Sequence, residues 1–406
     1  MVGGDPYKLV IAPPAQKPAL RKLAAVGILT TGFLVVYLIA VLRDQWIVLG
    51  LTGLAVAALI VLDRRPAWKW ELTDLFARER SVVVVSAAIL ALLAPLPLRR
   101  DPYILHVLVM VGISMILAIG LNFQVGSTGI PNLGFAAFYG VGAYASSLLA
   151  IAFALSFWTA IVLAACVAAL FGFLIGVPSL KTRTYHLALV SIAFGLVVYI
   201  LLNNLGFTGG PNGVKGIPAP VFLGQSLFTS VRIFGLAYPM QMNFYYLTLF
   251  FLAVTLLAAH CLYHSKIGLF WNAVREDEVA ARCSGINVST AKILAFCVGA
   301  FFAGIAGSLY AHYIGYISPE NFNMNVSLLI LGMVIMGGMD SVLGTCAGAF
   351  LLTIAPEKFR ALADYRMVAA GMIIILMLMF RPAGIVPRRL RDYRHILARK
   401  RETGAR

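Results

Sequence analysis

Residues 265–292 form the one long polar interruption in the second half of an otherwise apolar chain, and they read SKIGLFWNAVREDEVAARCSGINVSTAK. Their charged core is the run Arg275, Glu276, Asp277 and Glu278. Charges in such a run suit ion pairs and hydrogen bonds with a partner protein, and Glu278 is the natural acceptor. The simpler alternative is a solvated connector, because charged helix faces usually meet only water.

The spacing within this stretch predicts a helix, a turn and a second helix. Val274, Glu278 and Ala281 fall on one helical face. Gly285 can end that helix in a left-handed turn, and Ser289 and Thr290 can cap the span that follows. The residues that we expect to contact a partner are Arg275, Glu276, Asp277, Glu278, Ala280, Ala281 and Gly285.

Motifs for catalysis and nucleotide binding are missing from the sequence. It contains no GxxxxGK[ST] phosphate loop, no HExxH metal pair and no GxSxG nucleophile turn. The five cysteines include no CxxC pair, and the six histidines show no metal-site spacing. We therefore expect no catalytic residue, no metal, no cofactor and no enzymatic activity in this chain.

Composition sets the fold class. Of the 406 residues, 61% are hydrophobic and 12% are charged, whereas about a quarter of the residues are charged in soluble domains. This composition predicts an all-α, polytopic transmembrane protein. The net charge of +16 comes from basic residues between apolar runs and in the tail, which is typical of topology signals rather than of a nucleic-acid surface.

Apolar runs long enough, or nearly long enough, to cross a bilayer recur along the chain. They are residues 24–42, 45–62, 81–98, 103–121, 157–177, 185–202, 244–263, 293–316, 326–338, 342–356 and 367–380. Together with the glycine-rich segment 122–149, they predict about 10–12 spans, some of them short or broken. The runs 326–338 and 342–356 also allow a re-entrant hairpin.

Three regions are predicted along the chain. Residues 1–100 read as an N-terminal extension with about three spans and an interfacial helix in PAWKWELTDLFARER, whose apolar and charged side chains take opposite faces. Residues 101–387 form the membrane core. Residues 388–406 form a basic tail.

Two further groups of residues could build a pathway between helices. Small residues recur every fourth position at Ala295, Gly299, Ala303, Gly307 and Ala311, which predicts one helix face suited to close packing. The candidates for a solute pathway or a periplasmic contact loop are Asn122, Gln124, Asn132, Gly209, Gly210, Pro211 and Asn212. The last four lie in TGGPNG, which is also the chemistry of a tight turn.

The distribution of Lys and Arg predicts the orientation. If residues 1–23, 63–80, 178–184, 264–292 and 381–406 are cytoplasmic, that side collects 24 of the 32 basic residues. Both termini and residues 265–292 are then cytoplasmic. No acidic residue lies between Asp101 and Glu276, which disfavours transport coupled to protons or sodium.

Several motifs, in order, resemble the LivM-type permeases of branched-chain amino acid ABC importers. They include NAVREDEVAARCSGINVSTAKILAF, GAFFAGIAGSLYAHYIGYISPENF, MVIMGGMDSVLGTCAGA and MFRPAGIVP. With TGGPNG and RTYHLALVSIAFG, the similarity covers about residues 103–387. The resemblance implies a multi-pass permease of the bacterial inner membrane, with residues 101–387 as an ABC permease core.

The same resemblance implies partners. These are a second, LivH-like permease, two ATPases that are LivG- and LivF-like, and a periplasmic substrate-binding protein. In the family the cytoplasmic loop contacts an ATPase, and residues 275–285 match that motif here. ATP hydrolysis is then expected in the partner chains.

Departures from the family pattern leave the solute open. Phe135 follows Gly134 where the family commonly has histidine, Thr184 follows Arg183 where it often has glycine, and Leu196 replaces an acid. Related permeases carry urea, amides or aromatic acids, so these solutes remain alternatives to branched-chain amino acids. An ion-coupled secondary transporter and a structural or sensor subunit are less favoured, because the sequence lacks an intramembrane carboxylate and carries small-residue rows typical of a pathway.

The missing phosphate loop generates a first prediction. Purified alone, this chain should neither bind nor hydrolyse ATP, because it has no glycine-rich loop to hold the phosphates. Nucleotide binding measured on the isolated chain, freed of contaminating ATPases, checks this expectation. Saturable binding of ATP would contradict it.

Overall fold

The computed structural model describes residue 30 and residues 80–99, 101–179, 184–222, 224–229, 231–233, 236–358, 366–386 and 388. The contacts of the chain separate into two compact units, 1–98 and 99–406. In the first unit, helix α4 spans Arg80–Leu93. The predicted spans 24–42 and 45–62, nearly all of the predicted interfacial helix and the tail after Arg388 lie outside the described residues, and the predicted domain boundaries stay predictions.

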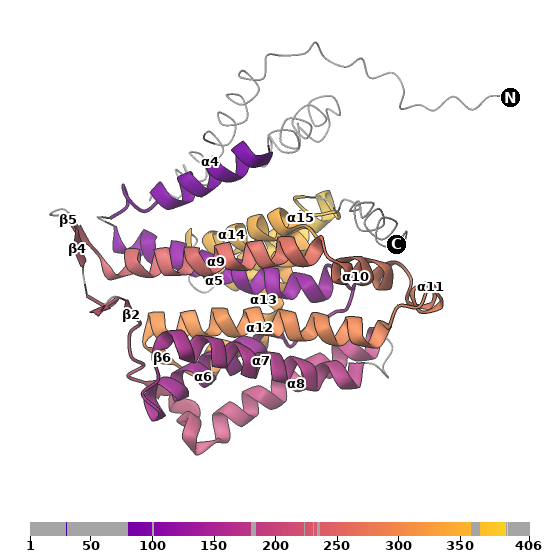
Figure 1. The fold of residues 1–406 in the computed structure, drawn as a ribbon, viewed down its shortest axis with the longest axis horizontal. Helices are drawn as coiled ribbons and strands as arrows, with labels where there is room; N and C mark the ends of the chain where they lie inside the picture. Colours follow the sequence, from indigo (N-terminus) through magenta and orange to yellow (C-terminus); the bar gives the residue numbers. More distant parts are fainter. Residues whose placement is uncertain are drawn as a thin grey trace, which may run out of the picture. The chain divides into compact units, whose positions relative to one another are not determined.

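Helices build the second unit (Figure 1). The long helices are α5 (Pro102–Val125), α6 (Phe135–Ala152), α7 (Phe157–Ser179), α8 (Thr184–Asn204), α9 (Met240–Tyr263) and α12 (Val288–Ile314). The shorter helices are α10 (Lys266–Glu276), α11 (Glu278–Cys283), α13 (Met324–Gly337), α14 (Val342–Lys358) and α15 (Arg366–Phe380). The predicted apolar runs from residue 103 onward therefore correspond to helices.

Seven helical segments among the described residues are long and apolar enough to cross a membrane. They are 102–125, 135–152, 157–178, 187–204, 240–263, 288–314 and 319–337, the last of which joins the 3-10 turn η3 (Pro319–Phe322) to α13. The all-α, polytopic transmembrane class is confirmed. Helix α14 packs beside α13 and, at 17 residues, is shorter than these seven segments.

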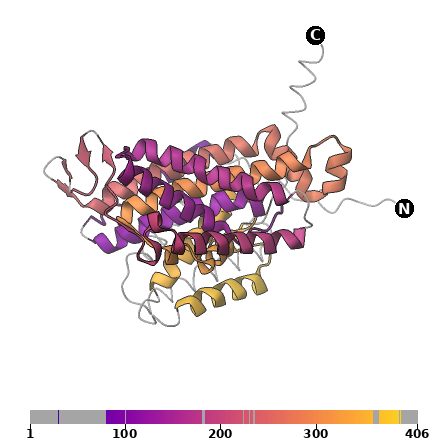
Figure 2. The ribbon, with the colours of Figure 1, turned by 90° about the horizontal axis from the view of Figure 1, so that it is seen from below.

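Short strands and 3-10 turns connect the helices at one end of this unit. Strand β1 (Val214–Lys215) pairs antiparallel with β6 (Tyr316–Ile317), β2 (Val221–Phe222) with β3 (Gln225–Ser226), and β4 (Val231–Ile233) with β5 (Leu236–Tyr238). The turns η1 (Gly206–Thr208) and η2 (Gly210–Asn212) precede β1. The labelled strands lie at one end of the long helices and α10 and α11 at the other, and the turned view agrees (Figures 1 and 2).

Helix α12 is the centre of the second unit and packs against α5, α6 and α7 (Figure 1). Its small residues Ala295, Gly299, Ala303, Gly307 and Ala311 are all buried. A Cβ added to Gly299 would lie 2.7 Å from the carbonyl oxygen of Gly120 in α5, and one added to Gly307 would overlap the carbonyl oxygen of Tyr139 in α6. The row of small residues therefore lets two backbones touch α12 directly.

Helices α13 and α14 form an antiparallel pair. The turn that connects them is hydrogen-bonded to the last described residues of the chain. Gly338 (φ 111°) and Asp340 (φ 68°) turn the backbone between them. After α15 the chain returns to this turn, where the N–H of Ile385 donates to the carbonyl oxygen of Met336 at 2.9 Å and that of Val386 to Gly337 at 3.0 Å. The turn is thereby tied to the segment that ends at Arg388.

Close packing at Gly307 generates a second prediction. Gly307→Ala should destabilise the chain by about 1–3 kcal/mol, because the new methyl group forces the backbones of α12 and α6 apart. Gly371→Ala in α15 is the matched control, since a Cβ there meets nothing within 4 Å. Thermal unfolding in detergent measures both variants. Equal midpoints for Gly307→Ala and wild type would contradict the prediction.

Candidate functional site

Helix α10 is anchored to the first turn of α12. The Ser265 hydroxyl accepts a hydrogen bond from the N–H of Ile267 and caps α10. The Trp271 side chain is fully buried, and its Nε1 donates to the carbonyl oxygen of Ala291 at 2.9 Å. A buried indole whose N–H has a partner fixes the position of its helix, so α10 is held against the bundle.

The polar stretch breaks at Asp277, and the prediction of one continuous helix over residues 274–281 is wrong. Asp277 is extended (φ −158°), and its carboxylate accepts from the N–H groups of Val279 at 2.7 Å and Ala280 at 3.0 Å. An aspartate in this position satisfies the free N–H groups of a first turn better than another helical residue can. It therefore ends α10 and begins α11.

Gly285 adopts the left-handed conformation (φ +81°) and ends α11. Its N–H donates to Arg282, and the N–H of Ile286 donates to Ala281, which is the bond pattern of a Schellman turn. The cap of α12 is Asn287, whose side chain accepts from the N–H of Thr290 at 3.1 Å. Ser289 and Thr290, which the sequence favoured as caps, already lie inside α12.

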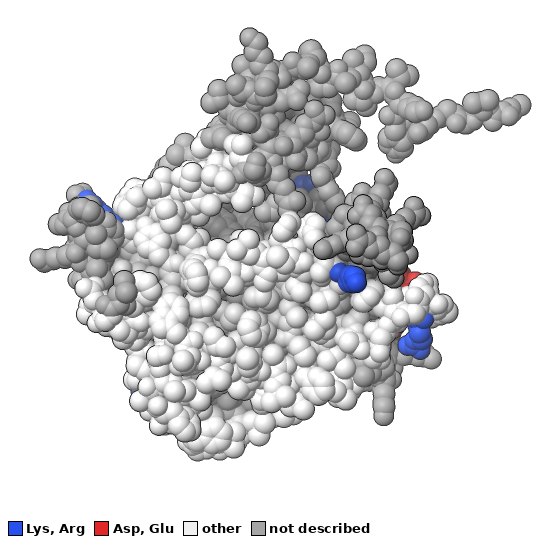
Figure 3. All heavy atoms as spheres, viewed as in Figure 1, with Lys and Arg blue, Asp and Glu red and all other residues white. Residues whose placement is uncertain are grey.

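The two sides of α11 differ. On the inner side Ala281 is buried, and Glu278 forms an ion pair of 2.5 Å with Lys292, whose side chain is 8% exposed. On the outer side Val279 is 72% exposed, and Ala280 and Cys283 are also exposed. On the face drawn in Figure 3, the visible acidic side chains and several basic ones lie near this end, further basic side chains lie elsewhere including the opposite end, and most of the surface between is uncharged.

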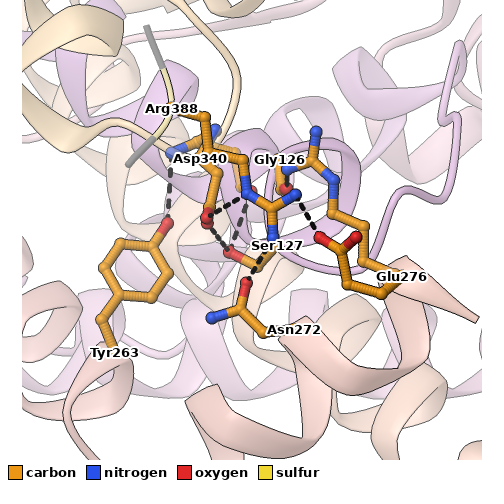
Figure 4. Close-up of polar contacts among 9 residues, drawn as sticks. Gly126, Ser127, Tyr263, Asn272, Glu276, Asp340 and Arg388 are labelled. Carbon is orange, nitrogen blue, oxygen red and sulfur yellow. Dashed lines mark hydrogen bonds and ion pairs between the residues drawn. The ribbon is translucent and has the colours of Figure 1, made fainter. Parts of the chain in front are cut away.

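A buried carboxylate joins this end of the bundle to the turn between α13 and α14 (Figure 4). The Asp340 side chain is 1% exposed. Its carboxylate accepts from the Ser127 hydroxyl at 3.1 Å and from Arg388 Nε at 3.3 Å. Its N–H donates to the Asn122 side chain at 2.9 Å. A carboxylate removed from water needs such partners.

Arg388 extends this contact to α10 (Figure 4). Its Nη1 pairs with Glu276 at 2.6 Å, and its Nη2 donates to the Asn272 side chain at 3.0 Å. We call Ser127, Asn272, Glu276, Asp340 and Arg388 the Asp340 cluster. Next to it, the guanidinium of Arg275 donates to the carbonyl oxygen of Gly126. Arg275 and Glu276 therefore bind within the chain.

Asn122, Gln124 and Asn132 are fully buried, and each of them forms hydrogen bonds within the chain. Asn122 donates to the Tyr263 hydroxyl at 3.1 Å, Asn132 donates to Gln124 at 2.6 Å, and Gln124 donates to the Phe296 carbonyl at 3.3 Å. Buried amides with satisfied partners rigidify a turn. Here they hold residues 126–134 between α5 and α6.

The remaining candidates, Gly209, Gly210, Pro211 and Asn212, lie at the other end of the bundle. Gly209 (φ +75°) joins η1 to η2, and the following Gly213 sits so close to β6 that a Cβ would overlap the Ile317 carbonyl oxygen. The structure thus separates two groups that the sequence placed together. It brings the amides to the end with α10 and α11 and leaves TGGPNG at the end with the strands (Figure 1).

Sequence reasoning missed Asp340, Arg388, Asn272, Ser127 and Lys292. Asp340 and the segment before Arg388 lie in the motifs MVIMGGMDSVLGTCAGA and MFRPAGIVP, but neither motif indicates a partner for Asp340. The signal that could have found it is an aspartate between two apolar runs, because a charge there needs a counter-charge. Nothing in the local pattern indicates which arginine supplies it.

Comparison with known proteins identifies the family. The family described as branched-chain amino acid transport system / permease component matches residues 103–380. The chain is 37% identical over 322 residues to the high-affinity branched-chain amino acid transport system permease protein LivM of Escherichia coli, covering 76% of this chain and 75% of that protein. It is 39% identical over 288 residues to LivM of Salmonella typhimurium, covering 68% of each.

The second permease type of these systems is also similar. The chain is 27% identical over 287 residues to the permease protein LivH of Salmonella typhimurium, covering 67% of this chain and 91% of that protein. No solved structure gives a significant match. The resemblance to LivM-type permeases is confirmed. The chain is a multi-pass membrane protein and belongs to the family of permease components of branched-chain amino acid transport systems.

Proposed function

We propose that this chain is the permease subunit of an ATP-driven importer of branched-chain, hydrophobic amino acids, in which residues 265–292 couple the spans to ATPase subunits. We call these residues the coupling loop. One observation carries the proposal. The loop is anchored on its inner side, while the outer face of α11 leaves Val279 at 72% exposure.

A solvated connector would not need this anchoring. Helix α11 has six residues, and a helix this short is marginal in water without packing. Its inner side is held by Ala281 and by the pair of Glu278 with Lys292. Its exposed small and apolar residues, Val279, Ala280 and Cys283, fit a shallow groove on a partner.

The contacts of the coupling loop reach α12, the turn after α5 and the turn after α13. Arg275 bonds the turn after α5, Glu276 and Asn272 reach the α13–α14 turn through Arg388, and Glu278 pairs with the first turns of α12. A displacement of the loop by a docked ATPase would therefore be passed to α5, α12 and α13 together. Rigid elements joined by hydrogen bonds and ion pairs carry such motion.

The proposed partners are those that the resemblance to LivM-type permeases implies. We propose a second, LivH-like permease, LivG- and LivF-like ATPases, and a periplasmic substrate-binding protein, in the bacterial inner membrane with both termini in the cytoplasm. The similarity to both LivM and LivH supports two permease types in one kind of system.

Urea, amides and aromatic acids remain alternative solutes, because the departures at Phe135, Thr184 and Leu196 bear on specificity. An ion-coupled transporter is less favoured by the structure. The buried carboxylate of Asp340 lies at the end with the coupling loop and is held by Ser127 and Arg388. Carboxylates that move ions usually face a pathway or cavity within the membrane.

Reconstitution tests the proposal as a whole. The chain, the second permease and both ATPases are placed in proteoliposomes, and uptake of radiolabelled L-leucine is measured with the binding protein, with ATP or a non-hydrolysable analogue. ATP-dependent uptake supports the proposal. Uptake that follows a proton or sodium gradient without ATP would replace it with the ion-coupled alternative.

The exposed face of α11 generates a third prediction. Val279→Asp should lower co-purification with the ATPases and ATP-driven uptake, because a charge buried without a partner at an interface costs about 2–5 kcal/mol. Val279→Ala at the same position keeps the face apolar and should retain both activities. If Val279→Asp assembles and transports at the wild-type rate, the loop is a solvated connector.

The Asp340 cluster generates a fourth prediction. Arg388→Ala should destabilise the chain by about 2 kcal/mol and uncouple ATP hydrolysis from uptake, because a buried carboxylate loses its arginine. Adding Asp340→Asn should recover stability, since the neutral amide needs no counter-charge. Glu276→Gln, at the exposed side of the same arginine, should change stability by less than about 1 kcal/mol. Thermal unfolding of the four proteins provides the comparison, and a double variant no more stable than Arg388→Ala would contradict it.

A further inference from the structure

A cavity of about 290 Å³ lies between α5, α6, α12, η3 and α13. Its lining residues are Met110, Ile113, Ser114, Leu117, Tyr139, Tyr310, Asn321, Val326, Leu329, Ile330 and Met333. No charged side chain is among them. The walls are mostly aliphatic, and the polar atoms are three hydroxyls and one amide.

The cavity extends from the middle of the bundle toward the end away from the coupling loop. Ser114 lies at the middle of α5, whereas Tyr310 lies in the last turns of α12 and Asn321 in η3, next to β6. Helix α12 begins at the coupling loop and reaches the cavity with its other end. In the orientation proposed above, the cavity faces the periplasmic half of the membrane.

Two hydroxyl groups that line the cavity have no hydrogen-bond partner among the described residues. Tyr139 is 6% exposed, and its hydroxyl makes no hydrogen bond with any described residue. The Ser114 hydroxyl likewise has no hydrogen-bond partner among the described residues. By contrast, the Tyr310 hydroxyl accepts from Asn321 at 2.7 Å. Because the Tyr139 hydroxyl lines the cavity and is not bonded to any described residue, it can bond a group that enters the cavity.

We propose that this cavity is a binding station for the transported solute, and that it takes one small molecule with an aliphatic body and a hydrogen-bonding, net-neutral head. This inference rests on the proposed importer function. The aliphatic walls would hold the hydrocarbon part, and the hydroxyls of Tyr139 and Ser114 would bond the head.

The volume of the cavity and the cost of an unpaired net charge inside a membrane narrow the class of solute that the cavity can bind. Small-molecule pockets range over about 300–1,000 Å³, so a cavity of about 290 Å³ suits one small solute. A solute with net charge would enter without a counter-ion, which is unfavourable inside a membrane. Zwitterionic amino acids with aliphatic side chains fit both limits better than acidic, basic or large aromatic ones.

Uptake of L-leucine by the reconstituted complex tests whether the Tyr139 hydroxyl binds the solute. Tyr139→Phe keeps the volume of the ring and removes the bond, so uptake should fall about five- to tenfold, the effect of one lost hydrogen bond, while assembly with the partners is unchanged. Tyr313→Phe is the matched control, because Tyr313 is a buried tyrosine whose hydroxyl bonds His106 at 2.8 Å and does not line the cavity. It should transport within about twofold of wild type.

Protection of an introduced cysteine from chemical labelling tests directly whether L-leucine occupies the cavity. Ser114→Cys, in a full complex whose chain has its five native cysteines replaced by alanine, is treated with a small maleimide with and without L-leucine. L-leucine should slow labelling several-fold, and L-glutamate should not. The measurement does not depend on transport, and so it still decides the question if a cavity variant transports poorly.

The outcomes separate the two proposals. If the wild-type complex takes up no L-leucine with ATP, the proposed function fails. If the wild type transports but Tyr139→Phe matches it and L-leucine gives no protection, the cavity is not a solute station and the importer function stands. Loss of complex assembly in Tyr139→Phe would show a subunit or packing contact instead and would also overturn the inference.

Discussion

The direct contact of α12 with the backbones of α5 and α6 is the constraint on which the second unit depends. Between helices in a membrane the hydrophobic effect offers little, because lipid tails are as apolar as leucine, and association relies on close packing and on hydrogen bonds. Gly299 and Gly307 bring α12 within contact distance of carbonyl groups on α5 and α6. This packing sets where Gln124 and Tyr139 lie, and therefore where the polar turn and the cavity form.

Buried polar groups add specificity to this packing at one end of the bundle. Asn122, Gln124, Asn132 and Asp340 are all buried, and each has partners within the chain. In a low-dielectric environment a polar group without a partner is expensive. Hydrogen bonds, and not apolar contact alone, therefore determine how α5, α9 and the α13–α14 turn are positioned relative to one another.

Helix α12 also gives the unit two ends with different chemistry. Its first turns meet Trp271 and Glu278 of the coupling loop, and its last turns contribute Tyr310 to the cavity. A single rigid helix between the two places is a direct physical route by which an event at one can alter the other. Coupling of this kind needs an element with two arrangements, and the turns at residues 126–134 and 338–341 are the places where the backbone leaves regular helix next to α10.

The sequence by itself determined the fold class, the positions of the apolar helices from residue 103 onward, and the left-handed turn at Gly285. These features depend on local properties, namely hydropathy over a window and the backbone freedom of single residues. Only the tertiary structure decided that Asp340 pairs with Arg388, that Arg275 and Glu276 bind inward, and that Val279 faces outward. The partners of Asp340 lie 48 to 218 positions away, and no local pattern encodes which distant residues meet, because that depends on how the helices pack.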